Sequence, residues 1–122
     1  MLNLDQDLRV YLCTTTTDMR RSFDRLAEMA LEHTGSNVIK GGMYVFFSRC
    51  RSRAKLLYWD GDGYALWYKR LEVGTFKIKL LESGHEEISG VDLKLLLSGM
   101  ELSRIKFRNH LKQGVYENHD TC

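Results

Sequence analysis

The chain has 122 residues, of which 43% are hydrophobic and 28% charged, a size and composition typical of one folded domain. Its apolar runs are far shorter than the roughly 20 residues of a membrane-spanning helix, its N-terminus lacks a secretory pattern, and its three cysteines have no zinc-site spacing. The net charge of +2 conceals a basic middle: residues 37–81 carry nine basic and three acidic residues, a net charge of +6, between two acidic ends. We therefore expect a cytoplasmic protein with an anionic partner, no membrane partner and no cofactor.

The first elements predicted are a strand followed by a helix. Apolar and polar residues alternate over 8–13, which predicts a half-buried strand. Hydroxyl and carboxylate groups at 14–18 are candidate N-caps for a helix. Apolar residues from Met19 to Leu31 follow a 3.6-residue period, and Gly35 is a natural helix end.

The middle of the chain predicts consecutive strands. A polar stretch at 48–53 is expected at a hairpin tip, and residues 60–63, Asp-Gly-Asp-Gly, form a strong tight-turn signal. The predicted strands are 43–47, 54–59, 64–70 and 75–80.

A second helix is expected to begin at Ser89, where Asp92 completes a capping pattern and leucines repeat at helical spacing. The predicted order β-α-β-β-β-β-α indicates an α+β domain over residues 1–100, an antiparallel β-meander sheet with helices packed on one face. Residues 101–122 lack a clear period and are expected to form a basic, flexible C-terminal tail.

Basic side chains cluster around the predicted hairpin tip and on the strand after it. If 49–53 is extended, alternate arginines face one side, and guanidinium groups fit phosphate oxygens. The alternative is a merely solvated tip. The candidate nucleic-acid-binding residues are Arg49, Arg51, Arg53, Lys55, Lys69 and Arg70.

Other groups of side chains that could carry chemistry are explained more simply by structural roles. The strand aromatics at 58–68 could stack on unpaired bases, but they more often form cross-strand pairs. Asp60 and Asp62 fit the tight turn, Asp18 fits a helix cap, and Asp24 can pair with Arg20 at i, i+4. The histidines show no metal spacing. We therefore predict no catalytic residue, no metal ligand and no enzymatic activity.

Two stretches resemble a known family. TDMRRSFDRLA at 17–27 is similar to its signature T-D-M-R-K-[SG]-F-D-G-L, with Arg25 in place of the glycine. LLYWDGDG at 56–63, WYKRLE at 67–72 and GTF at 74–76 resemble its core, and the arginines at 49–53 match its basic stretch. The family is the TnpB accessory protein, product of the second open reading frame, of IS-sixty-six type insertion sequences, and the resemblance covers about residues 8–100.

The resemblance implies a bacterial accessory protein that supports DNA transposition beside a separate transposase. Its implied partners are DNA at the transposon ends and the element-encoded transposase, with DNA bound through the basic hairpin. One alternative is a protein–protein adaptor that recruits the transposase through Arg20, Arg21 and Asp24. Another alternative is a small metal-dependent nuclease that uses Asp60 and Asp62.

Overall fold

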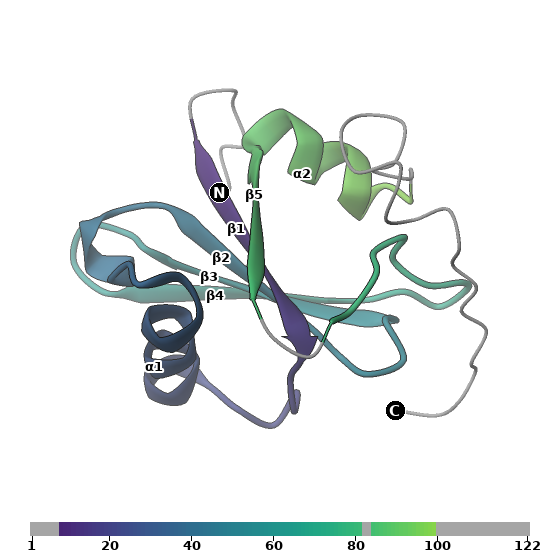
Figure 1. Ribbon diagram of the computed structural model, residues 1–122, viewed down its shortest axis with the longest axis horizontal. Helices are drawn as coiled ribbons and strands as arrows, with labels where there is room; N and C mark the ends of the chain where they lie inside the picture. Colours follow the sequence, from purple (N-terminus) through teal and green to yellow (C-terminus); the bar gives the residue numbers. More distant parts are fainter. Residues whose placement is uncertain (1–7, 82–83, 100–122) are drawn as a thin grey trace.

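A mixed sheet of five strands lies at the centre of the computed structural model, which describes residues 8–81 and 84–99 (Figure 1). The predicted α+β class and the predicted order of strands and helices are confirmed. Neither of the α-helices, 23–34 and 90–97, is long and apolar enough to cross a membrane. The predicted tail at 101–122 lies outside the described residues. The elements are β1 (Arg9–Thr16), α1 (Phe23–Thr34), the 3-10 helix η1 (Val38–Lys40), β2 (Met43–Phe47), β3 (Arg53–Trp59), β4 (Tyr64–Arg70), β5 (His85–Ser89) and α2 (Gly90–Leu97).

The sheet order is β4-β3-β2-β1-β5, and one of its pairings is parallel. β2, β3 and β4 form the predicted antiparallel meander, and β5 is antiparallel to β1. β1 and β2, however, run parallel, which corrects the expectation of a fully antiparallel sheet. The physical reason is the connection: α1 carries the chain back along the sheet, so β2 starts at the same end as β1.

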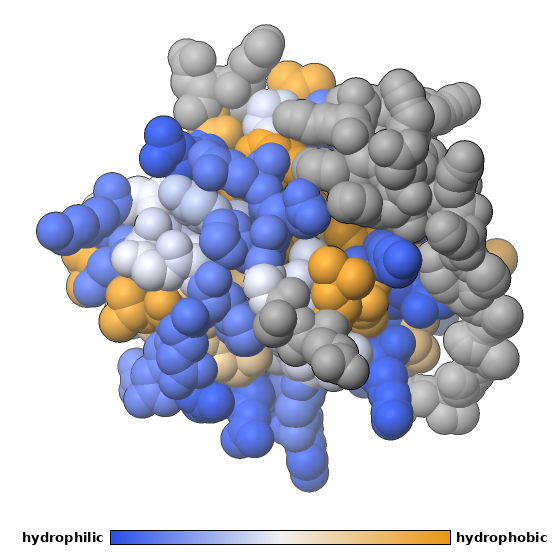
Figure 2. All heavy atoms as spheres, in the orientation of Figure 1, coloured by the Kyte–Doolittle hydropathy of each residue, from blue (hydrophilic) through white to orange (hydrophobic). Residues whose placement is uncertain are grey.

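The two helices cover opposite faces of the sheet, as Figure 1 shows, and this corrects the expectation that both pack on one face. All five residues of β2 are buried, although successive side chains of a strand point to opposite faces. An apolar strand of this kind needs a cover on each side. On the outside, Figure 2 shows hydrophilic residues over much of the coloured surface of one face.

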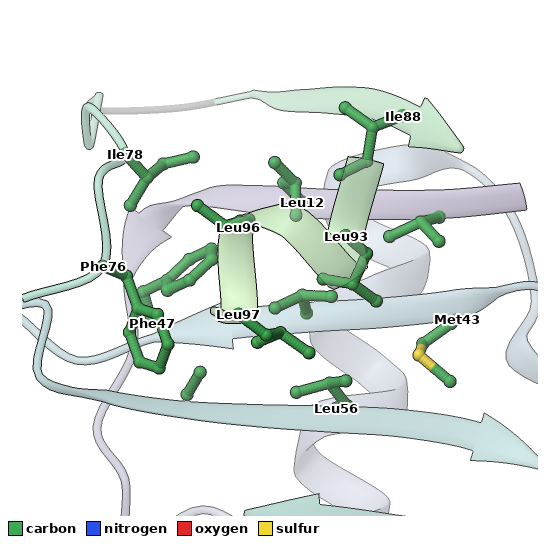
Figure 3. Close-up of a cluster of buried hydrophobic side chains, with 13 residues drawn as sticks. Leu12, Met43, Phe47, Leu56, Phe76, Ile78, Ile88, Leu93, Leu96 and Leu97 are labelled. Atoms are coloured by element: carbon green, nitrogen blue, oxygen red, sulfur yellow. The ribbon is translucent and has the colours of Figure 1, made fainter. Parts of the chain in front are cut away.

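The larger core lies between α2 and the sheet (Figure 3). Leu12 of β1, Phe47 of β2 and Leu56 of β3 point toward Leu93 and other leucines of α2. Full burial of one such side chain contributes about 1.5–3 kcal/mol. The second core packs α1 against the other face through Leu26, Met29 and Ala30.

Helix α1 begins later than predicted. Residues 14–16 continue β1, because β-branched threonines fit a strand as well as a helix cap. The N-cap is Ser22, so Met19 precedes the helix. The predicted end is confirmed: Gly35 has a φ of 77°, and its N–H donates to the carbonyl of Leu31.

The predicted strand at 75–80 is absent, and the fifth strand of the order is β5 instead. Phe76 and Ile78 are buried, so the alternation identified the core side correctly. The Phe76 N–H donates to the carbonyl of Arg51 at 2.7 Å. Because Arg51 is a loop residue, this hydrogen bond does not add the segment 75–80 to the sheet as a strand. The predicted start of α2 is confirmed: the Ser89 hydroxyl accepts the N–H of Asp92 at 3.1 Å.

Candidate nucleic-acid interface

Two loops meet at the carboxyl ends of β1 and β2. Because these strands are parallel, residues 17–22 after β1 and residues 48–52 after β2 leave the same end of the sheet, where the two arrowheads lie in Figure 1. The Thr17 N–H donates to the carbonyl of Phe47 at 2.9 Å, which holds the loops side by side. Crevices outside the carboxyl ends of parallel strands are common ligand sites in α/β sheets.

The loop between β2 and β3 is the predicted hairpin tip, and it forms a tight turn, so the condition that 49–53 is extended is not met. The Arg51 N–H donates to the carbonyl of Ser48 at 2.9 Å, and Arg51 has a positive φ of 60°. The Ser48 hydroxyl also accepts the N–H of Arg53 at 3.1 Å. Strand alternation therefore does not align Arg49, Arg51 and Arg53 on one side, and each must be placed by its own contacts.

Arg53 and Arg70 lie opposite each other on β3 and β4. Both side chains belong to the α1 face, together with Tyr68, whose hydroxyl lies 3.4 Å from Nη1 of Arg53. Arg70 is exposed and forms an ion pair with Glu72, with Nε 3.0 Å from Oε2. Like charges held at opposite positions of a strand pair destabilise the pair, so this arrangement has a cost in stability.

Lys55, a predicted phosphate contact, is a buried structural residue. It is only 7% exposed, and its Nζ donates to the carbonyl of Arg21 at 2.7 Å. The same ammonium lies 4.9 Å from the centre of the Tyr68 ring, within the range of a cation–π interaction. The structure therefore places Lys55 between the sheet and the start of α1, where its ammonium group already interacts with groups of the protein.

Lys69 points away from the other candidates, because successive residues of a strand alternate faces. Its β4 position pairs with Ala54, which belongs to the α2 core. Its Nζ donates to the carbonyl of Leu97 at 3.2 Å, at the C-terminal end of α2, where a cation is favourable. The predicted continuous patch of Lys69 and Arg70 is thus divided between two faces.

A cavity of about 500 Å³ opens where the two loops meet β4, and we call it the basic cavity. Thr17 and Tyr68 were not among the predicted site residues, although Tyr68 belongs to the strand aromatics that could stack on unpaired bases and both residues lie within the resembling stretches. Asp18 and Met19 complete the lining. Three arginines and three hydroxyl-bearing residues form the rest: Arg20, Arg49, Arg53, Thr17, Ser48 and Tyr68.

Asp18 is the carboxylate of this lining, and Arg20 neutralises it. Nη2 of Arg20 lies 2.7 Å from Oδ2 of Asp18, Nε donates to the same carboxylate, and the Arg20 N–H donates to Oδ1 at 2.9 Å. These hydrogen bonds hold the pKa of Asp18 well below its usual range. The cavity therefore keeps an excess of positive charge from Arg49 and Arg53.

The proposed protein-interaction residues are all exposed, but only Asp24 lies on α1. Arg20 precedes the helix and pairs with Asp18, so the expected Arg20–Asp24 pair is not formed. Arg21 is exposed and its carbonyl accepts from Lys55. Asp24 is exposed in the first turn of α1, where a negative charge is favourable.

The carboxylates of the nuclease alternative lie in the β3–β4 turn. Asp60 and Asp62 are both exposed, and the Asp60 N–H donates to the carbonyl of Gly63 at 2.8 Å, as a tight turn requires. Within residues 8–81 and 84–99, no three His, Cys, Asp or Glu side chains are placed to hold one metal ion. Trp59 and Tyr64 flank this turn as an edge-to-face pair with ring centres 5.3 Å apart.

Comparison with known proteins gives a family and two relatives. The family described as IS66 Orf2 like protein matches residues 8–107. Two proteins of Sinorhizobium fredii (strain NBRC 101917 / NGR234), each named only as uncharacterized, are similar to this chain. One, y4hO, is 39% identical over 101 residues, which cover 83% of this chain and 88% of the relative. The other, y4jC, is 28% identical over 106 residues, 87% of this chain and 91% of the relative. No solved structure matches significantly.

Proposed function

The chain belongs to the IS66 Orf2-like family of insertion-sequence accessory proteins, and from this premise we propose that it supports transposition by binding DNA without catalysis. The DNA-binding surface is the basic cavity and its rim, with Arg49 and Arg53 as the main phosphate contacts. One observation carries the proposal: three arginines converge on a cavity whose carboxylate is already paired. Guanidinium groups bind phosphate oxygens in a fork, and cations that replace condensed counterions bind nucleic acid.

The contacts within the molecule narrow the set of DNA-binding residues. Arg49 and Arg53 line the cavity, and Arg70 lies beside it in a second hollow of about 310 Å³ that also includes Arg53. Lys55 and Lys69 are held by backbone carbonyls, so they stabilise the fold instead of contacting DNA. The proposed contacts are to phosphates. Contacts of this kind position a protein on DNA but do not recognise its base sequence.

The test is a titration of the purified full chain with terminal-repeat DNA of its own element at several salt concentrations. A double variant, Arg49→Ala with Arg53→Ala, removes two charges from the cavity. We expect weaker binding and a salt slope, log K against log salt concentration, that is smaller by about 2 because each phosphate contact adds about 0.9.

The matched control, Lys40→Ala with Lys94→Ala, removes the same charge from exposed positions before β2 and on α2, away from the cavity. It should leave the slope nearly unchanged. Equal effects of the two double variants would show that only net charge matters and would contradict the assigned surface. Capture of the element-encoded transposase after nuclease treatment, without any DNA binding, would instead support the adaptor alternative.

A further inference from the structure

Two buried polar groups beside the basic cavity have no hydrogen-bond partner. In the described part of the chain, Oγ1 of Thr17 and Nε of Arg53 are the buried side-chain polar atoms without a partner. Both residues line the cavity, and Thr17 is only 5% exposed. Leaving such a group unsatisfied destabilises the fold, so native proteins rarely retain one without a reason. A ligand with several acceptor oxygens would supply the missing partners.

The other groups of the cavity select a phosphate as that ligand. Nε and one Nη of a guanidinium form the edge that fits two oxygens of a tetrahedral oxyanion, and Nε of Arg53 belongs to this edge. Arg49 adds a second cation, and the hydroxyl of Tyr68 adds a donor next to Arg53. Asp18 does not repel an anion strongly, because Arg20 already binds its carboxylate.

The burial of Thr17 favours a strand end over a duplex as the ligand. Phosphates of a duplex lie along a convex backbone between neighbouring nucleotides, so they reach an open surface more easily than an enclosed group such as Oγ1 of Thr17. A terminal phosphate has one ester link and can enter a cavity. The volume of about 500 Å³ lies in the range of roughly 300–1,000 Å³ that is typical of small-ligand sites.

A path for the rest of the strand leaves the cavity over Tyr68. The second hollow shares Arg53 and Tyr68 with the basic cavity and continues to Arg70, which pairs there with Glu72. Tyr68 is 49% exposed, so its ring can contact an unpaired nucleotide as the strand leaves. Arg70 then lies where the next phosphate would follow.

We propose that the basic cavity binds the terminal phosphate of an unpaired DNA strand, with Arg53, Thr17 and Arg49 around the phosphate. Because the ligand is a DNA strand, this role rests on the proposed DNA binding. The group recognised is a phosphate monoester, which a strand can carry at its 5′ or its 3′ end. No bond is made or broken, so the cavity holds the strand end without chemical reaction.

The test compares short single strands of one sequence that end in a 5′-phosphate, a 3′-phosphate or hydroxyls only, by fluorescence anisotropy with the full chain. One of the phosphorylated strands should bind about tenfold more tightly than the hydroxyl-ended strand, and which one it is identifies the end that the cavity accepts. Equal binding of all three strands, with salt-dependent duplex binding retained, would overturn the cavity's role and leave the proposed function intact. Absence of binding to every DNA at low salt would overturn both.

Thr17→Val is the sharpest variant because it removes the unpartnered hydroxyl and keeps the shape of the side chain. The fold should be at least as stable as before, since the variant loses no protein hydrogen bond and no longer buries an unpartnered hydroxyl. The preference for the phosphorylated strand should nevertheless fall about fivefold. Thr16→Val, at an exposed neighbouring position, is the matched control and should leave the preference unchanged.

Arg53→Lys tests the fork geometry separately, because lysine keeps the charge and loses the bidentate edge. It should reduce the preference for the phosphorylated strand while duplex binding keeps its salt slope. A preference that survives both Thr17→Val and Arg53→Lys would place the phosphate elsewhere and overturn the assignment.

Discussion

The substitution Lys55→Met tests whether Lys55 stabilises the fold or contacts DNA. Methionine keeps most of the length and apolar stem of lysine but removes the ammonium. The variant loses the hydrogen bond to the carbonyl of Arg21 (2.7 Å) and the cation–π contact with Tyr68 (4.9 Å). If Lys55 is structural, the substitution should lower stability and leave DNA binding nearly unchanged.

The expected loss follows from these two contacts. A hydrogen bond with a charged donor contributes about 1.5–3 kcal/mol, and a partly desolvated cation–π contact contributes about 0.5–2 kcal/mol. Part of this is recovered, because the variant no longer buries an ammonium group and water can reach the exposed Arg21. We expect a net loss of about 1–2 kcal/mol, which lowers the melting temperature by roughly 4–8 °C in a chain of this size.

The assay is thermal and urea unfolding of Lys55→Met beside the control Lys77→Met at an exposed position. The control should melt within a degree or two of the wild type, since surface substitutions have small effects. The affinity of Lys55→Met for DNA, measured below its melting temperature, should stay within about twofold, because no phosphate contact is lost. Unchanged stability together with a clear loss of DNA affinity would refute the structural role and restore Lys55 to the DNA-binding surface.

Two further predictions concern the fold and the Asp18–Arg20 pair. Phe76→Ala should destabilise the protein by about 3–5 kcal/mol in urea unfolding, because Phe76 is fully buried with its ring centre 5.8 Å from that of Phe47; a loss below about 1 kcal/mol would mean that the loop 71–81 is not part of the core. The Asp18 carboxyl should titrate well below its ordinary value of about 3.9 when followed by NMR, and Arg20→Gln should return its pKa toward that value. Because the folded-state pKa is the lower one, the stabilisation from Asp18 is present above about pH 4 and is lost as the pH falls toward the folded-state pKa.

Features that depend only on residues close together in the sequence could be predicted without the structure. Gly35 ends α1 and Ser89 caps α2 because the required backbone freedom and the capping hydroxyl belong to those residues themselves. The turn at 60–63 is equally local. The threonines at 14–16 could not be assigned in this way, since the same residue type favours a cap and a strand, and the pairing of Thr16 with Phe47 of β2 decided between them.

The candidate site could be predicted only in part, because its groups come from three separate segments. The sequence identifies Arg49 and Arg53 as neighbours in a basic stretch, and both line the cavity. It does not show that Lys55 is held by a carbonyl 34 positions away, or that Lys69 reaches α2. These outcomes depend on which face of the sheet each side chain occupies and on what covers that face.

The parallel pairing of β1 and β2 is what assembles the basic cavity. In the fully antiparallel sheet expected from the sequence, the loop after β1 would lie beside the start of β2, far from the turn at 48–52. Thr17 and Arg20 could then not share a cavity with Arg49 and Arg53. Because α1 returns the chain before β2 begins, the loop at 17–22 meets the basic stretch at 49–53 at one end of the sheet. The crossover helix α1 therefore brings together the two loops that form the proposed DNA-binding cavity, although α1 itself contributes no residue to the cavity lining.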